Sequence, residues 1–413
     1  MNNVLVVGRG GREHAIAWKL QQSPKVKKVY VAPGNKGMES VATLVNIDEL
    51  DFEALVAFTK SENIALTIVG PEVPLAKGIV DYFNKEGLAV FGPNSAAAEI
   101  EASKSFSKTF MEKYDIPTAA SKVFTDCQQA CLYVKNLSTP IVIKSDGLAA
   151  GKGVAILNSV EEAIVTLKDM MENEKYGSAS RKVVIEEFLN GEEYTFMAFV
   201  NGENVYPMEL SRDYQKAYDG DKGPITGGMG AYSPAIKISK EETAAAEDIL
   251  NKCAKGLAKE GRPFTGFLYG GFISGPNVIE FNSRFGDPEA EVLLPRLESD
   301  LFEVIETLLK GEAPTLKWSS DVAVGVVLAS TGYPEAPKTG YPISGLEDLK
   351  PDTLVFHCGT DYKDGAYITN GGRVLMVVRM AKSFAQARDE VYEEIAKIKC
   401  EELFWRTDIL AGI

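Results

Sequence analysis

The sequence predicts a multidomain protein that joins an α/β domain to α+β domains. Its 413 residues exceed what one hydrophobic core usually serves, so about two to four domains are expected. Roughly the first hundred residues alternate between short apolar runs and amphipathic segments, as in a doubly wound parallel sheet. The remainder mixes helices with longer strands and hairpin signals. We therefore expect domains over residues 1–102, 103–314 and 315–413, the last a small C-terminal α+β domain.

The N-terminal domain is predicted from buried strands rich in Val, Ile and Leu, with helices between them. Each strand ends in Gly or Pro, and open α/β sheets bind ligands beyond these carboxyl ends. The expected strands are Val4–Val7, Val29–Ala32, Leu66–Val69 and Ala89–Phe91, and the expected helices are His14–Leu20, Phe52–Lys60 and Ala76–Asn84.

The two later domains show an α+β pattern. In the central domain we expect helices over Lys104–Tyr114 and Val160–Met171, and strands over Ile141–Lys144, Val183–Glu187, Tyr194–Val200 and Val205–Leu210. In the C-terminal domain we expect strands over Val322–Ala329, Leu354–Gly359 and Val374–Val378, and a helix over Ala385–Ile398.

Composition and charge narrow the class of protein. Hydrophobic residues make up 45% and charged residues 25%, as in soluble globular proteins, and the net charge of −14 disfavours nucleic acid as a partner. The start of the chain lacks the pattern of a secretory signal, and no apolar run reaches ~18 residues, so no membrane span is expected. Five scattered cysteines indicate reduced thiols and a cytoplasmic protein. Because there are only two histidines, catalysis should depend on carboxylates, Lys, Arg and a metal ion.

A glycine-rich loop between two strands is the first candidate for chemistry. The strand Ile141–Lys144 places Lys144 at its end, and the loop Gly147–Gly153, with three glycines and a further lysine, precedes the next strand. Glycines leave backbone N–H groups free to approach phosphate oxygens, and the lysines add positive charge. The loop lacks the Ser or Thr of a Walker A element, and a surface hairpin with solvated lysines is the alternative.

The segment Val183–Glu193 is the second candidate. An apolar strand ends at the paired acids Glu186 and Glu187 and turns at Asn190-Gly191, which would leave its backbone open to an adenine edge. Glu193, past the turn, would accept hydrogen bonds from ribose hydroxyls. An ordinary hairpin with acidic residues at its rim is the alternative.

The strand Val278–Asn282 supplies a candidate metal site. Residues i and i+2 of a strand share a face, so Glu280 and Asn282 point together. Two oxygen ligands side by side suit Mg²⁺, which completes its shell with phosphate and water. If the strand continues, Arg284 lies on the same side and would stabilise charge on a transferring phosphoryl group. A buried structural Glu–Arg pair is the alternative.

These three segments occur in the order found in ATP-grasp enzymes, and the whole chain resembles the glycinamide ribonucleotide synthetase family. The resemblance implies that residues 103–314 form an ATP-grasp fold with a lid subdomain over about 120–190. The similar segments are Gly10-Gly11-Arg12-Glu13-His14, Val69-Gly70-Pro71-Glu72, Phe91-Gly92-Pro93, Lys144–Val154, Thr226–Pro234, Glu280–Glu289 and Thr369–Val374.

The resemblance implies an ATP-dependent carboxylate–amine ligase that joins glycine to 5-phosphoribosylamine. ATP would be hydrolysed to ADP and phosphate through glycyl phosphate, giving glycinamide ribonucleotide in the second step of de novo purine biosynthesis. It also implies Mg²⁺, or Mn²⁺ in its place, and small molecules as the partners of a monomer or weak dimer. Two alternatives stay open: another ATP-grasp carboxylate–amine ligase, and a dinucleotide-binding oxidoreductase, whose fingerprint would need a glycine where Glu13 stands.

The resemblance also implies roles for individual residues. Lys144 and Arg284 would be catalytic, and Glu280 and Asn282 would bind the metal ion. The nucleotide would contact Lys104, Lys144, Gly151, Lys152, Glu186, Glu187, Phe188, Leu189 and Glu193. The other substrates would contact Gly8, Gly10, Gly11, Arg12, Glu13, Asp213, Gly227, Gly228, Arg284 and Asp287.

The chain departs from the family pattern in several segments, most of them expected beside glycine and the ribosylamine. The family usually has Asp-His-Lys-Arg where this chain has Asp213-Tyr214-Gln215-Lys216, Asn in place of Ile225 and Gln in place of Glu291. We expect these departures to affect the roles of individual loop residues more than the reaction class.

Overall fold

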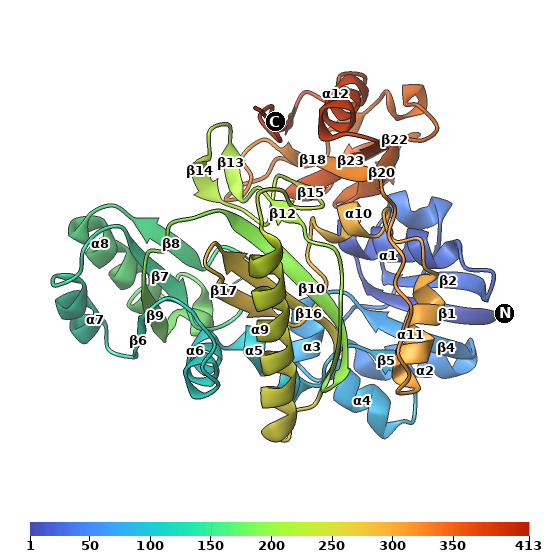
Figure 1. Ribbon diagram of the computed structural model, residues 1–413. Helices are drawn as coiled ribbons and strands as arrows, with labels where there is room; N and C mark the ends of the chain where they lie inside the picture. The colour runs from blue at the N-terminus through green and yellow to red at the C-terminus, as the bar shows by residue number, and fades with distance from the viewer. Residues whose placement is uncertain (150, 413) are drawn as a thin grey trace.

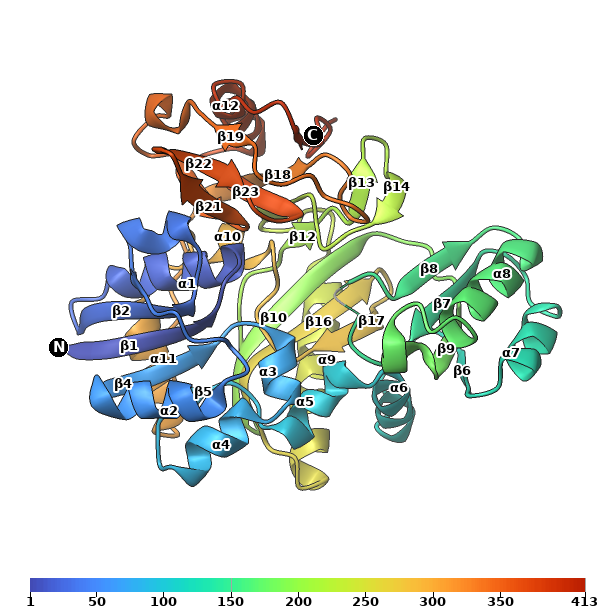
Figure 2. The same cartoon turned by 180° about the vertical axis from the view of Figure 1, so that it is seen from behind.

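Five parallel strands form the N-terminal sheet of the computed structural model, which describes residues 1–149 and 151–412 (Figures 1 and 2). The strand order is β3-β2-β1-β4-β5. Alternate residues of β1 pack into two different cores, Val4 and Val6 on one face and Leu5 and Val7 on the other. The predicted doubly wound sheet is therefore confirmed. The strands are β1 Asn2–Gly8, β2 Val26–Pro33, β3 Thr43–Leu44, β4 Ile64–Val69 and β5 Val90–Phe91.

Helices cover both faces of this sheet. The predicted helix Ala76–Asn84 is instead two helices, because Gly78 adopts a left-handed conformation with φ of 89° between them. The elements are α1 Gly11–Gln21, η1 Lys36–Ser40, α2 Phe52–Ser61, α3 Glu72–Ala76 and α4 Ile79–Lys85.

A helix from much later in the chain completes one face of the N-terminal sheet. Helix α11, Leu301–Leu309, contributes Leu301 and Ile305 to the core that also contains Val4 and Val6. Both ribbon views show α11 beside the sheet. Ser23 donates a hydrogen bond of 2.6 Å to Asp300, the residue that caps this helix. The N-terminal domain is thus covered in part by residues beyond the predicted boundary at 102.

The central domain is built on an antiparallel sheet in the order β11-β10-β16-β17. Its strands are β10 Glu193–Gly202, β11 Asn204–Pro207, β16 Phe264–Ile273 and β17 Asn277–Asn282. Helices α5 Ser95–Ala102, α6 Lys104–Lys113 and α9 Lys240–Lys259 share one core with this sheet, and the short α10, Ala290–Leu293, follows it.

A separate lid projects from the central domain, as expected for the ATP-grasp fold (Figure 1). Its antiparallel sheet has the order β6-β9-β7-β8 and packs against two helices. Ala150, in the glycine-rich loop between β7 and β8, lies outside the described residues. The elements are β6 Ser121–Phe124, α7 Cys127–Val134, β7 Ile141–Ser145, β8 Val154–Leu157, α8 Val160–Met171, η2 Gly177–Ser180 and β9 Val183–Glu187.

The C-terminal sheet recruits strands from the central region. Its path is β12-β15-β18-β23-β20, with β24 paired to β18, so β12 and β15 join strands from beyond the predicted boundary at 314. Helix α12, Phe384–Ile395, packs on β18 and β23. The strands are β12 Arg212–Asp213, β13 Lys216–Tyr218, β14 Lys222–Ile225, β15 Gly230–Ser233, β18 Val322–Ser330, β19 Pro342–Ile343, β20 Leu354–His357, β21 Thr360–Lys363, β22 Ala366–Thr369, β23 Arg373–Ala381 and β24 Leu403–Phe404, with η3 at Leu346–Asp348.

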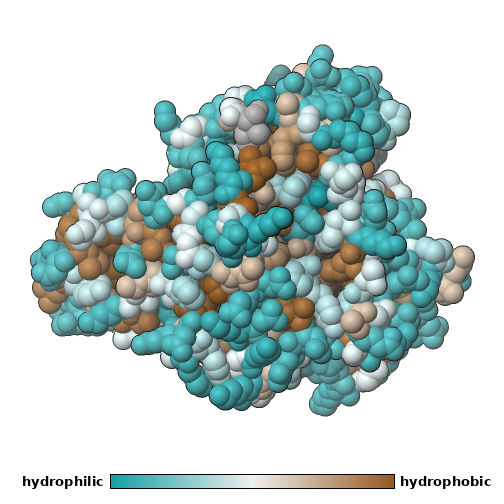
Figure 3. Space-filling view, viewed as in Figure 1, coloured by the Kyte–Doolittle hydropathy of each residue, from teal (hydrophilic) through white to brown (hydrophobic). Residues whose placement is uncertain are grey.

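The molecular surface is mainly hydrophilic in the view of Figure 3, with small apolar areas over the lid and near the centre. Leu132 and Val165 are among the exposed apolar side chains of the lid. None of the helices in the described part of the chain has the length and apolar character needed to cross a membrane. The five cysteines are all free thiols.

Candidate active site

A cavity of about 230 Å³ lies where the central sheet, the lid and the segment around Thr226 meet. Most of the predicted nucleotide, metal and acyl-group residues line it, although they are distant in sequence. From those predictions the lining includes Lys104, Lys144, Gly151, Glu186, Glu187, Phe188, Leu189, Glu193, Asp213, Gly227, Glu280, Asn282, Arg284 and Asp287.

Lys144 reaches this cavity from the end of β7 and is 4% exposed. Its ammonium lies 3.0 Å from Glu186 Oε2 and donates to the carbonyl of Ile279 at 3.1 Å. Glu186 is also 3.2 Å from the ammonium of Lys108. Strand β7 therefore places this lysine beside strand β17, which contains Glu280 and Asn282.

Glu280 and Asn282 share one face of β17, as the strand periodicity predicted. Asn282 Nδ2 donates to Glu280 Oε1 at 3.1 Å. Burial raises the pKa of Glu280, but Lys104, Lys144 and the hydrogen bond from Asn282 outweigh it and lower the pKa overall. The carboxylate is thus kept ionised, which is the form that binds a divalent cation.

Arg284 lines the cavity and is also paired with the buried Glu101 and the partly exposed Glu72. Its Nε lies 3.2 Å from Glu101 and 3.5 Å from Glu72, and its guanidinium carbon lies 6.0 Å from the ring centre of Tyr269. Glu101 accepts two further hydrogen bonds of 2.8 Å from Ser283. A structural ion pair therefore fixes a guanidinium that lines the cavity, and its action on a transferring phosphoryl group stays a prediction.

Asp213 and Glu289 form an acidic corner of the cavity. Glu289 is 2% exposed and lies 3.1 Å from the hydroxyl of Thr195. Burial raises the pKa of both carboxyls, and Glu289 raises that of Asp213 further. In all, nine acidic and three basic side chains line the cavity, so it favours cations.

The glycine-rich loop lines this cavity, as does Gly227 in the loop that follows β14. A Cβ atom added at Gly151, which has φ of 73°, would lie 3.8 Å from the Cα of Gly227. A Cβ atom at Gly153 would overlap the hydroxyl of Ser145. Glycine thus suits the left-handed backbone at Gly151 and the close approach to Ser145 at Gly153. The predicted Lys152 and Gly228 are absent from the lining that the described residues form.

A second cavity of about 800 Å³ opens between the N-terminal and C-terminal domains. Gly10 and Gly11 line it at the start of α1, together with backbone from Gly359, Gly371 and Gly372. Its other lining residues include Arg9, Asn35, Lys36, Cys358, Thr360, Asp361, Asp287 and Arg373. Asp287 lines both cavities and therefore marks their junction.

The remaining predicted residues of the first loop lie beneath this second cavity. Arg12 and Glu13 are buried and form an ion pair of 2.5 Å, and Glu13 also accepts a hydrogen bond of 2.6 Å from the backbone of Gly10. Gly8 has φ of 130° and approaches the Glu13 side chain closely. These three residues shape the loop, and their contact with a substrate stays a prediction.

Arg373 is a candidate site residue that sequence reasoning did not identify. Its Nη1 donates to the carbonyl of Gly227 at 2.7 Å and lies 2.9 Å from Asp287 Oδ1. The hydroxyl of Tyr333 accepts a hydrogen bond of 3.0 Å from the Gly227 backbone. The segment Thr369–Val374 resembled the family, and that was the available signal, but β23 lies far along the chain from these partners.

The two histidines, His14 and His357, line neither of these cavities. The backbone N–H of His357 donates to Nδ1 of His14 at 2.9 Å and joins β20 to α1. Burial lowers the pKa of His14 to about 3 and that of His357 to about 4. Both rings are therefore neutral structural groups near pH 7.

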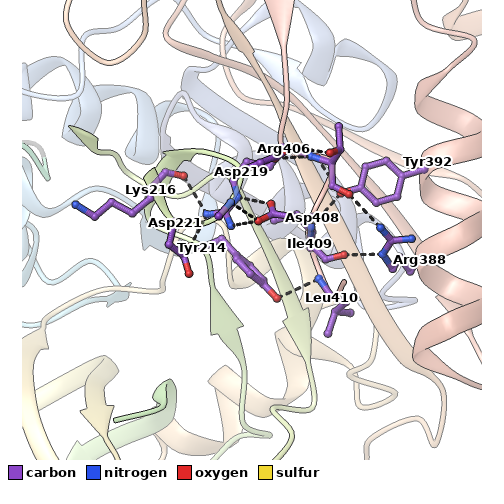
Figure 4. A network of polar contacts seen from close by, with 12 residues as sticks. Tyr214, Lys216, Asp219, Asp221, Arg388, Tyr392, Arg406, Asp408, Ile409 and Leu410 are labelled. Carbon is purple, nitrogen blue, oxygen red and sulfur yellow. Dashed lines mark hydrogen bonds and ion pairs between the residues drawn. The ribbon is translucent and has the colours of Figure 1, made fainter. Parts of the chain in front are cut away.

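The C-terminal tail contacts the hairpin of β13 and β14, which leads into the Gly227 loop (Figure 4). Arg406 is 1% exposed and pairs at 2.7 Å with Asp221 of the hairpin and with Asp408 of the tail. Its guanidinium also lies 4.9 Å from the ring centre of Tyr214, whose hydroxyl accepts a hydrogen bond of 3.0 Å from Leu410. Tyr214, one of the departures from the family pattern, thus anchors the tail in this chain.

The fold and the first cavity together define an ATP-dependent ligase of the ATP-grasp class. The parallel sheet precedes an antiparallel central sheet, and the glycine-rich loop of the lid lines the same cavity as Lys144, Glu280 and Asn282. Family models match the chain over three ranges: the phosphoribosylglycinamide synthetase N domain over residues 2–101, the ATP-grasp (A) domain over 102–290 and the C domain over 323–411. The chain belongs to the phosphoribosylglycinamide synthetase family.

Similar proteins agree with this assignment over their full lengths. A phosphoribosylamine–glycine ligase of Halalkalibacterium halodurans is 56% identical, covering 98% of this chain and 96% of the relative. One from Listeria innocua is 52% identical, covering 98% and 99%. The crystal structure of the Thermotoga maritima phosphoribosylamine–glycine ligase has a TM-score of 0.86 at 35% identity, covering 98% and 99%. A biotin carboxylase from Campylobacter jejuni, at 13% identity with a TM-score of 0.76 and covering 100% and 99%, shares the fold.

Proposed function

We propose that this enzyme joins glycine to 5-phosphoribosylamine with ATP, through glycyl phosphate, to give glycinamide ribonucleotide, ADP and phosphate. The supporting observation is that Lys144, Glu193 and Glu280 line one cavity beneath a glycine-rich loop. Membership of the family supports the choice of substrates, with relatives of similar length at 56% and 52% identity.

The first cavity would hold the nucleotide. The strand and turn from Glu187 to Leu189 would meet adenine, Glu193 the ribose, and Lys104 and Lys144 the phosphates. The acid-rich lining suits a divalent cation, and Glu280 with Asn282 would hold Mg²⁺ or Mn²⁺ through one oxygen each. Bound there, the cation would neutralise charge on the transferring phosphoryl group.

Glycine would lie between the acidic corner and Arg284. Asp213 and Glu289 suit its ammonium, and this arrangement turns the carboxylate toward the phosphates. Attack of that carboxylate on the γ-phosphate forms glycyl phosphate, and the cationic side chains stabilise the charge that develops. The loop Gly147–Gly153 would exclude the water that hydrolyses this acyl phosphate.

The second cavity would hold 5-phosphoribosylamine. Backbone N–H groups at Gly10 and Gly11 and the guanidinium of Arg373 suit its phosphate and hydroxyls. The amine would then reach the acyl phosphate at the junction of the cavities, where Asp287 can accept the proton that it loses. Holding both reactants together supplies much of the rate enhancement, so no enzyme nucleophile is needed.

We further infer a cytoplasmic enzyme that acts as a monomer or weak dimer on small molecules. Free thiols support this location, because reducing compartments keep cysteines unpaired. Domain boundaries near 102 and 314 remain our proposal, although α11 packs across the first and β12 and β15 join a sheet across the second.

An ADP-release assay tests the proposed function. We expect release to need ATP, glycine and freshly made 5-phosphoribosylamine together, with a small glycine-only rate that hydroxylamine converts to glycyl hydroxamate. ADP release that is indifferent to glycine would refute the proposal.

A further inference from the structure

Lys108 is a buried cation that lies behind the first cavity. It is on α6, is 8% exposed and is not among the residues that line the cavity. Its ammonium donates to the hydroxyl of Thr118 at 2.8 Å and to the carbonyl of Ala119 at 3.3 Å, and lies 3.2 Å from Glu186 Oε1. The ammonium thus donates two hydrogen bonds and forms an ion pair with Glu186.

These partners belong to the two places where the chain crosses between core and lid. The chain enters the lid after Thr118 and Ala119 and returns to the core after β9, which contains Glu186. The two crossings are tied together, because Glu187 N donates to Ala120 O at 3.0 Å and Ala120 N donates to Glu187 Oε1 at 2.9 Å. Lys108 touches both crossings from the core side.

The same contacts extend to the residues proposed to act on ATP. Thr118 donates to the carbonyl of Val278 at 2.6 Å, and Lys144 donates to that of Ile279 at 3.1 Å, two neighbouring groups on the metal strand β17. Glu186 lies between two lysines, so its carboxylate charge is shared between Lys108 and Lys144. Without Lys108, the whole charge of Glu186 would act on Lys144 and hold it away from a phosphate.

We propose that Lys108 is a positioning residue that balances the charge of Glu186, frees Lys144 for the nucleotide phosphates and fixes the lid crossings. The inference rests on the proposed placement of ATP in the first cavity. It assigns to Lys108 an effect on nucleotide affinity without contact with the nucleotide.

The test is calorimetric titration of the full-length protein with ATP and Mg²⁺ in the absence of glycine. We expect Lys108→Met, which keeps the length of the side chain, to raise the dissociation constant roughly tenfold or more. The double variant Lys108→Met/Glu186→Gln should recover most of this loss, because it leaves no unbalanced carboxylate beside Lys144. Lys113→Met is the matched control, since Lys113 lies on the same helix but is 59% exposed and pairs with Glu260; it should bind ATP as the wild type does.

The outcomes are separable. Wild-type affinity in Lys108→Met, or equal losses in the single and double variants, would overturn the positioning role. If Lys108→Met does not fold, Lys108→Arg must bind ATP within about threefold of the wild type, and a larger loss overturns the inference as well. If the wild type itself binds no ATP, the proposed function is refuted, and the inference about Lys108 is refuted with it.

Discussion

Replacement of Arg373 by methionine probes the junction between the two cavities. The guanidinium links its own strand to two other segments, because it donates to the carbonyls of Gly227 and Asp287 and forms an ion pair with the Asp287 carboxylate. Methionine keeps the apolar stem and removes the charge. Asp287 would then lose its ion-pair partner at the point where we place the amine.

The expected magnitude follows from these contacts. Hydrogen bonds to a charged group contribute about 1.5 to 3 kcal/mol each. Since one nitrogen, Nη1, makes all three contacts at 2.7, 3.0 and 2.9 Å, they are not independent, and we take about 3 kcal/mol for the set. At about 1.4 kcal/mol for each tenfold change, kcat/KM for 5-phosphoribosylamine should fall roughly 100-fold.

Two assays separate this effect from general damage. ADP release with both substrates measures the complete reaction, and trapping with hydroxylamine measures the activation of glycine alone. The second should fall far less, because Lys104, Lys144 and Glu280 are untouched. Arg379→Met is the matched control: Arg379 lies on the same strand and pairs with Asp352 and Glu390, away from both cavities. It should lower stability but leave kcat/KM near the wild-type value.

The result that refutes this reasoning is equal loss in the two assays. It would mean that Arg373 supports the whole cavity and has no particular role at the junction. An unchanged kcat/KM would show that the Asp287 carboxylate needs no partner for the reaction.

Three further predictions concern the metal strand, the glycine-rich loop and the histidines. Glu280→Ala should abolish Mg²⁺-dependent turnover with the fold intact by circular dichroism; near-normal turnover would remove the metal assignment. Shortening the loop Gly147–Gly153 should lower turnover and expose the intermediate, and the lid hypothesis is wrong if hydroxylamine then traps no more glycyl hydroxamate than in the parent. The folded-state pKa values of His14 and His357, about 3 and about 4, lie below the ordinary 6.5, so the unfolded chain binds more protons as the pH falls. The free energy of unfolding in urea should therefore drop by about 1.6 kcal/mol for each histidine between about pH 6.5 and pH 5; a flat profile would contradict their burial as neutral rings.

Local patterns in the sequence predicted much of the fold and of the first cavity. Strand β7 with Lys144, and strand β17 with Glu280 and Asn282, follow from apolar runs and from the alternation of side chains along a strand. The helix α9 was not predicted, although Ser239 and Glu242 form a capping box at its start.

Such patterns could not predict residues whose roles depend on contacts with distant parts of the chain. Lys108 has no distinguishing neighbours in the sequence, and its importance comes from Glu186, Thr118 and Ala119 lying around it. Arg373 meets Gly227 only because two domains pack together. Sequence periodicity specifies which face of an element is buried, whereas these contacts depend on how complete elements are placed.

The return of helix α11 to the first sheet has a consequence for synthesis of the chain. Val4 and Val6 leave the ribosome long before Leu301 and Ile305, the residues that cover them in the finished protein. Until then one side of the early sheet exposes apolar surface, a state in which nascent chains aggregate readily. A fragment that stops at residue 102 would keep that side exposed permanently, so we expect it to precipitate or to require a chaperone.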